Sequence, residues 1–96
     1  MNNNTIKFTK GETNLMAKYQ LVSDQRDYTA TPYLETFNRF SGEAVNLNQF
    51  ALKLYSKIMN LVKSYESGVH INVSEMDRLR YLFLKLFPKE YMILLD

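Results

Sequence analysis

The chain has 96 residues, no cysteine, and a formal net charge of +2 from twelve basic and ten acidic residues. This length predicts one domain, over residues 1–96, with a thin core, and the hydrophobic share of 46% argues against wholesale disorder. The lack of cysteine excludes disulfides and thiolate zinc sites, and the small net charge is far from that of a dedicated nucleic-acid-binding protein.

The sequence carries no signal for a membrane or for export. No apolar run approaches the ~20 residues of a membrane-spanning helix. The start, Met-Asn-Asn-Asn, has neither the basic nor the apolar region of a signal peptide. We therefore expect a cytoplasmic protein with no membrane partner, in which residues 1–4 form a flexible polar tail.

The N-terminal third gives one clear pattern and one ambiguous pattern. Residues 5–9 alternate, with Ile6 and Phe8 on one side, which predicts a short strand. Residues 14–22 fit either a strand that pairs with 5–9 or a helix behind a Thr13 cap. Helix propensity favours the helix weakly. Residues 23–30 read as a polar loop.

Residues 32–40 are predicted to form the first main helix. Thr31 is followed by a proline, which is tolerated in the first turn of a helix. The apolar residues of this segment follow helical spacing, and Ser41-Gly42 ends it. These apolar residues are Tyr33, Leu34, Phe37 and Phe40.

Residues 47–66 are predicted to form a long amphipathic helix with both ends marked. Asn46 is the expected N-cap, with Gln49 placed to reach back, and Gly68 is suited to a left-handed stop. Apolar residues three and four apart line one face, and we expect the tyrosines among them, with Tyr33, to be core. The apolar stripe comprises Leu47, Phe50, Ala51, Leu54, Tyr55, Ile58, Leu61, Val62 and Tyr65.

The last third predicts a brief extended segment and two helical pieces. Val69 to Val73 alternates and is expected to pair with Ile6 and Phe8. Ser74 to Asp77 resembles a capping box that opens a helix over 75–87. A proline at position 88 makes the remaining residues a separate short turn. The predicted fold is mostly α: a small three-helix bundle with an irregular, partly extended N-terminal segment and a short C-terminal helical turn.

No catalytic, cofactor or metal site is predicted. His70 is the single histidine and has no partner at a recognisable catalytic spacing. Asp24, Asp27 and Glu35 are too loosely spaced for a calcium loop, and no glycine-rich phosphate loop is present. We therefore expect a protein that is not an enzyme.

The best functional signal is a surface for another protein. Arg80 lies on the apolar side of its helix, where it either pairs with a carboxylate such as Glu35 or Glu43 or anchors a partner. Tyr81 lies on the outer side, and the chain ends in an apolar segment that could also mediate a homodimer. The predicted partner-binding residues are Arg78, Arg80, Tyr81, Lys85, Tyr91 and Tyr28.

Two hypotheses follow from these residues. The first is a non-enzymatic protein-binding module, such as an inhibitor or adaptor of a host complex. The composition is typical of small phage or mobile-element accessory proteins, which act in the host cytoplasm. The alternative is a nucleic-acid-binding protein that uses the polar face of the long helix through Lys53, Lys57 and Lys63, although that face has no arginine to read guanine.

Overall fold

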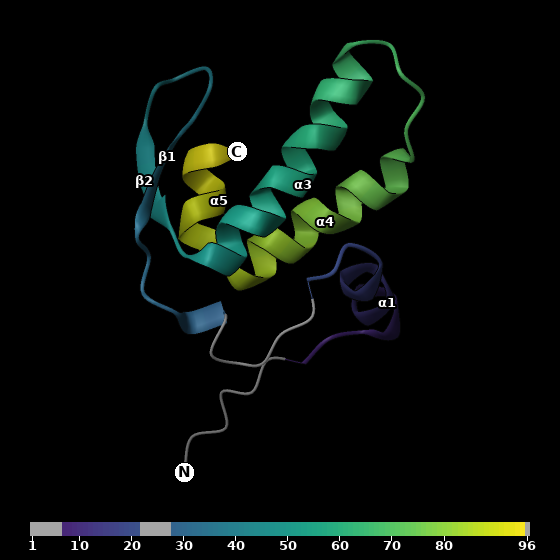
Figure 1. Cartoon of the computed structure of the whole chain (residues 1–96), viewed down its shortest axis with the longest axis horizontal. Helices are drawn as coiled ribbons and strands as arrows, with labels where there is room; N and C mark the ends of the chain where they lie inside the picture. Colours follow the sequence, from purple (N-terminus) through teal and green to yellow (C-terminus); the bar gives the residue numbers. More distant parts are fainter. Residues whose placement is uncertain (1–6, 22–27, 96) are drawn as a thin grey trace.

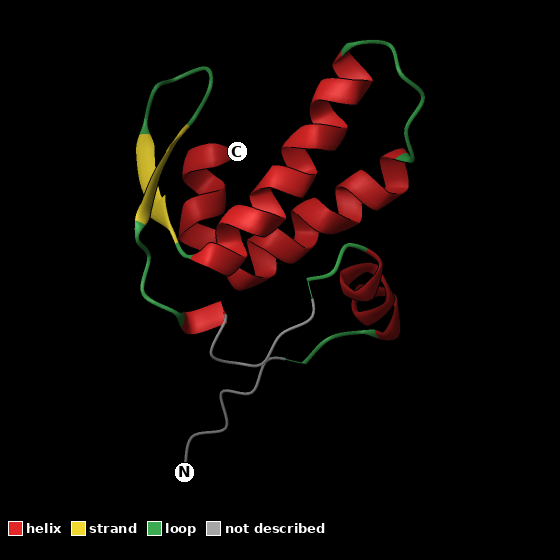
Figure 2. Cartoon of the chain, viewed as in Figure 1, coloured by secondary structure: helices red, strands yellow, loops and turns green. Residues whose placement is uncertain are grey.

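The computed structural model describes residues 7–21 and 28–95 of the chain. Within them, most residues are helical, which confirms the mostly α prediction, but a β-hairpin is also present (Figures 1 and 2). The elements in order are α1 (Lys10–Lys18), β1 (Leu34–Phe37), β2 (Ala44–Leu47), α3 (Gln49–Glu66), α4 (Val73–Leu86) and α5 (Pro88–Leu94).

Helices α3 and α4 form the centre of the core. They pack side by side near the start of α3 and splay apart toward the loop that joins them (Figure 1). Each fully buried leucine, isoleucine or phenylalanine side chain stabilises the fold by about 1.5–3 kcal/mol. The side chains that α3 and α4 bury are Phe50, Ala51, Leu54, Ile58, Leu79, Leu82 and Phe83.

The two ends of α3 show one prediction that is wrong and one that is confirmed. The N-cap is Asn48, whose side chain accepts from the Ala51 N–H at 2.8 Å, and not Asn46, which lies in β2. Gly68 has φ +85° beyond the C-terminal end. The Val69 N–H donates to the Ser64 carbonyl at 2.9 Å, so the left-handed stop is formed as predicted.

The predicted helix over 32–40 is wrong, and with it the three-helix bundle. β1 pairs antiparallel with β2, from Leu34 opposite Leu47 to Phe37 opposite Ala44. Aromatic and β-branched residues favour strands, and the helical stripe here was only four apolar residues long. Val45 and Leu47 give this segment a pairing partner that its own periodicity does not reveal.

Helix α1 confirms the helical alternative for the described part of 14–22, but with a different start. Thr9 caps it, because its Oγ1 accepts from the Glu12 N–H at 3.1 Å while Glu12 accepts from the Thr9 N–H at 2.9 Å. The predicted cap at Thr13 is therefore wrong, as is a strand at 7–9. The tail over 1–4, Thr5, Ile6, Val22 and most of the predicted loop (23–27) lie outside the described residues.

The last third differs from the prediction mainly at the start of α4. Asn72 caps this helix by accepting from the Glu75 N–H at 3.1 Å, two residues before the predicted cap at Ser74. Residues 69–72 are irregular and do not pair with Phe8, which contacts Tyr28 instead. The break at Pro88 is confirmed, since α5 begins there as a separate helix.

Candidate protein-binding groove

An open groove lies between the hairpin tip, α3, the first half of α4 and the end of α5. Its cavity is about 350 Å³, which is at the lower end of the range typical of ligand pockets. Its apolar wall consists of Tyr55, Met59, Val62, Tyr65, Met76, Leu94 and Leu95, and the others that line it are Asn38, Arg39, Phe40, Glu66 and Arg80.

The groove exists because the apolar face of α3 is wider than α4 can cover. Leu54 and Ile58 are fully buried against the core. Tyr55, Met59 and Val62 are spaced four and three residues apart and follow the flank of that stripe, where they are only half-buried. The flank therefore remains as an apolar wall facing the hairpin tip.

Asn38 fixes the hairpin tip over the end of α5. Its Oδ1 accepts from the N–H groups of Phe40 at 2.7 Å and Ser41 at 3.0 Å, which closes the turn. Its Nδ2 donates to the Ile93 carbonyl at 2.9 Å and the Leu94 carbonyl at 3.3 Å. One side chain thus satisfies orphan carbonyls of a helix end and orients the tip.

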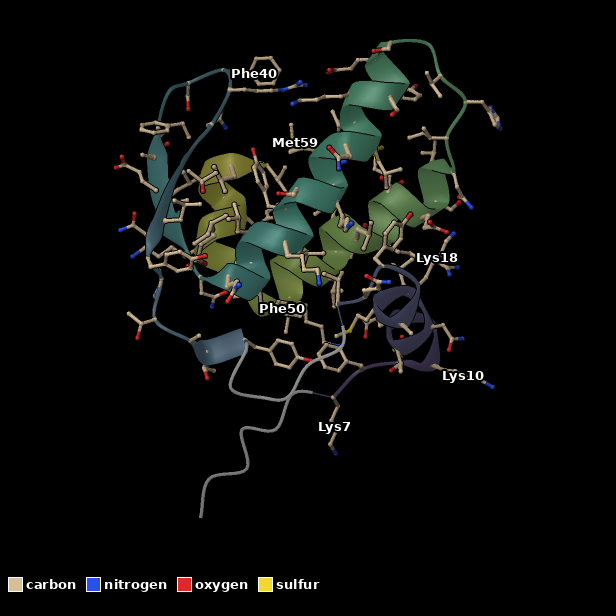
Figure 3. The ribbon with its side chains drawn as sticks, in the orientation of Figure 1. Lys7, Lys10, Lys18, Phe40, Phe50 and Met59 are labelled. Carbon is tan, nitrogen blue, oxygen red and sulfur yellow. The ribbon has the colours of Figure 1, made fainter. Side chains whose placement is uncertain are left out.

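An ion pair joins the hairpin tip to the end of α3 at the groove rim. The Arg39 guanidinium binds Glu66 through both nitrogens, one of them at 2.9 Å, and lies 4.6 Å from the centre of the Phe40 ring. The hydrogen bond from Arg39 holds the pKa of Glu66 below its usual value. Phe40 stands at the tip of the hairpin (Figure 3) and is 84% exposed, so an apolar ring marks this end of the groove.

Arg80 is the groove cation with the weaker partner. Its nearest ion-pair partner is Asp77 on the same helix, at 3.8 Å, and its side chain is 38% exposed. A carboxylate pairs with Arg80 as predicted, but it is Asp77 on its own helix and not Glu35 or Glu43, which lie on the hairpin. Among the described residues, Arg80 therefore has a longer carboxylate contact than Arg39, and its side chain lines the groove partly exposed.

Arg80 also lines a second, smaller hollow between α4 and α5. This hollow has a volume of about 190 Å³ and is lined by Asp77, Arg80, Tyr81 and Tyr91. Three of the six residues predicted to bind a partner thus meet around one depression. Tyr81 is 69% exposed, and arginine with tyrosine is the composition typical of interface hot spots.

The other three predicted residues lie elsewhere. Lys85 donates to the Lys7 carbonyl at 2.6 Å and to Glu12 at 2.9 Å, and Arg78 also lies near α1, with its Nη1 3.9 Å from where a Cβ on Gly11 would be. Tyr28 is only 8% exposed and makes edge-on ring contacts with Phe8 and Phe50. Tyr28 belongs to the core and not to an exposed surface.

Sequence reasoning missed much of the groove. Asn38, Phe40 and Met59 were not singled out as site residues, and Tyr33 and Tyr65 were expected in the core, yet both are exposed. The available signal was the width of the apolar face of α3. A face that includes Tyr55, Met59, Val62 and Tyr65 beside the buried stripe needs more than one neighbouring helix to cover it.

The lysine face of α3 is only partly available. The Lys53 Nζ donates to the Gln20 carbonyl at 2.8 Å, whereas Lys57 is half-buried and Lys63 is exposed. Lys63 lies by a shallow hollow of about 310 Å³ that also includes Thr36 and Asn60. The nucleic-acid alternative stays a prediction.

Within the described part of the chain, neither metal-ligand clusters nor membrane-spanning helices are found. No three His, Asp or Glu side chains come together at a spacing that would hold a metal ion, and His70 is exposed. No helix there is both long and apolar enough to span a bilayer. We compared the chain with protein-family models, curated proteins and solved structures, and none of these comparisons gave a match.

Proposed function

We propose that the chain is a non-enzymatic protein-binding module that acts as an inhibitor or adaptor through the groove. The observation that carries this proposal is the position of Arg80, which lies between an apolar groove and a tyrosine-lined hollow and whose ion-pair partner among the described residues is Asp77 at 3.8 Å. An arginine in such a place suits a partner that supplies both apolar side chains and a carboxylate.

The chemistry of the groove sets the kind of segment it accepts. Two methionines, Met59 and Met76, face the cavity, and methionine adapts to partners of different shape. Arg39 is already paired with Glu66, so a carboxylate on the partner would go to Arg80. We therefore infer a short partner segment with two apolar side chains and one Asp or Glu.

A random-peptide display library tests this inference without a known partner. We expect selection on the immobilised chain to enrich peptides that combine apolar residues with an acid. Fluorescence anisotropy of an enriched peptide then measures affinity, and Arg80→Ala should weaken binding about tenfold, which is ~1.4 kcal/mol. Replacing the acid of the peptide with its amide should give a similar loss.

Arg78→Ala is the matched control, because Arg78 lies on the same helix but on the flank that meets α1. This variant should bind the peptide as the unmodified chain does. Equal binding by Arg80→Ala, or enrichment of peptides without any acid, would show that Arg80 does not read the partner. Failure to enrich any peptide would count against the groove as a peptide-binding surface.

A further inference from the structure

The hairpin has a free edge that lies apart from the groove. β2, and not β1, makes the hairpin's main contacts with α3 and α5, so β1 is the outer strand of the sheet. Three of its four residues are exposed. Figure 1 shows the hairpin on the opposite side of the molecule from α1.

Hydrogen bonding in the hairpin fixes which backbone groups of β1 are free. The Asn38 N–H donates to the Glu43 carbonyl at 2.8 Å, which makes these two residues a hydrogen-bonded pair. Such pairs alternate along an antiparallel ladder, so Thr36 also bonds toward β2. The N–H and carbonyl groups of Glu35 and Phe37 consequently point away from β2.

We propose that two copies of this chain pair antiparallel through β1 and so form a four-stranded sheet across a twofold axis. Glu35 of one copy would lie opposite Phe37 of the second copy, and the reverse, so that four backbone hydrogen bonds form. The axis passes beside Thr36. Pairing of this kind is isologous and closed, and it leaves no edge of β1 free for further copies.

The outward backbone groups of β1 favour this one register. Leu34 and Thr36 bond toward β2 by the same alternation, and the Tyr33 N–H donates to the Leu47 carbonyl at 3.1 Å. Within β1, Glu35 and Phe37 therefore present both groups outward, and pairing Glu35 with Phe37 uses both residues of each copy. Each of these two residues offers one donor and one acceptor. A second copy of the same strand can therefore satisfy all of these backbone groups.

Side chains on the outer face agree with this register. Glu35 and Phe37 lie on the same face of β1, so each acid would meet a phenylalanine and not another acid. Phe37 is 56% exposed, so its ring is available for contact with a second copy. The strand is only four residues long, so the interface falls below the ~1,000 Å² of a stable complex, and we expect a weak dimer.

A charge exchange tests the register directly by sedimentation velocity over about 10⁻⁵–10⁻³ M protein, the range in which a weak dimer is populated. Phe37→Glu places two acids opposite each other twice and should weaken association at least about tenfold. Glu35→Lys combined with Phe37→Glu makes each opposite pair complementary. This double variant should restore the original affinity to within about threefold.

Val69→Glu is the matched control, because Val69 is also 56% exposed and lies in the loop between α3 and α4. It should associate as the unmodified chain does. The proposal would be overturned if the unmodified chain stays monomeric over this range of protein concentration, or if the double variant fails to regain affinity. Phe37 does not line the groove, so Phe37→Glu should still bind groove peptides, and the two proposals can fail separately.

Discussion

Helix α4 has two flanks that differ in how far their polar groups are satisfied. On the flank that meets α1, Glu75 accepts from the Lys18 Nζ at 2.8 and 2.9 Å and from the Tyr19 hydroxyl, and Lys85 pairs with Glu12 at 2.9 Å. Figure 3 shows Lys18 where α1 approaches α4. On the groove flank, the ion-pair partner of Arg80 within residues 7–21 and 28–95 is Asp77, at 3.8 Å.

The difference shows that one flank is an internal contact and the other a free surface. Helix α1 buries only Leu15 and Met16, so polar contacts must supply much of what holds it to α4. Burial and the neighbouring Glu75 raise the pKa of Tyr19 to about 12, so the phenol stays a hydrogen-bond donor at any physiological pH. The groove flank instead has apolar walls and a partly exposed cation whose carboxylate partner is 3.8 Å away.

The largest expected effect lies in the core beneath both flanks. Ile58 lies on the core face of α3 and is fully buried, so Ile58→Ala should lower the free energy of unfolding by about 2–5 kcal/mol. Lys57→Ala, at the next position on the polar side, should cost under about 0.5 kcal/mol. If urea melts gave equal losses of unfolding free energy for both variants, the face of α3 that we assign to the core would be the wrong one.

The carboxylates on the α1 flank should make the free energy of unfolding depend on pH in the acidic range. The Lys18 ammonium and the Tyr19 hydroxyl hold the pKa of Glu75 below 4.5, so its stabilisation is present above the unfolded-state pKa and is lost as the pH falls through the folded-state pKa. Partial burial raises the pKa of Glu12, but the Thr9 N–H and Lys85 outweigh it, so the net shift of Glu12 is also downward.

Glu75→Gln should therefore cost about 1–2 kcal/mol at neutral pH, since it removes charge-assisted hydrogen bonds at a mostly buried carboxylate. Its effect should shrink as the pH is lowered below about 4.5, because the carboxylate it replaces becomes protonated there. Thermal melts from pH 7 to pH 3 measure both quantities. If the stability difference between the unmodified chain and Glu75→Gln stayed constant from pH 7 to pH 3, the ion pair would be excluded as its cause.

The groove flank should respond in the opposite way. Arg80→Ala with Tyr81→Ala removes side chains that protrude into the two hollows, so the free energy of unfolding should change by less than about 0.5 kcal/mol. Binding of a selected groove peptide should weaken by at least about 1–2 kcal/mol. A melting temperature lowered as much as in Glu75→Gln would show that this flank is structural too.

Strong local signals in the sequence predicted where helices lie, stop or begin, whereas elements that depend on distant partners were missed. Weaker local signals gave the wrong caps at Asn46, Thr13 and Ser74. The part of the apolar stripe of α3 from Phe50 to Ile58, Gly68 and Pro88 are local signals, and the structure confirms what each predicted. The hairpin was missed because β1 has only four residues and is stabilised by pairing with β2. That partner strand lies beyond a six-residue turn, so the local pattern of β1 does not reveal it. The groove was missed for the same reason, since its lining comes from four elements.

The smallest expected effect concerns the two helix ends that use the same left-handed stop. α3 ends with Gly68, whereas α1 ends with Gln20 at φ +58°, and there the Leu21 N–H donates to the Met16 carbonyl at 2.7 Å. A left-handed conformation costs a residue with a Cβ roughly 1–2 kcal/mol, and part of this is offset by the greater unfolded-state freedom of glycine. Gln20→Gly should therefore stabilise the protein by about 0.5 kcal/mol.

The reciprocal variant, Gly68→Gln, should destabilise the protein by about 1 kcal/mol, because nothing lies within 4 Å of where its Cβ would be and the backbone conformation is what opposes the change. Urea melts of both variants measure the pair of values. The Gln20→Gly change keeps the carbonyl that accepts from Lys53, so the contact between α1 and α3 stays intact. A loss of stability in Gln20→Gly would mean that the Gln20 side chain, and not its backbone, holds this end of α1.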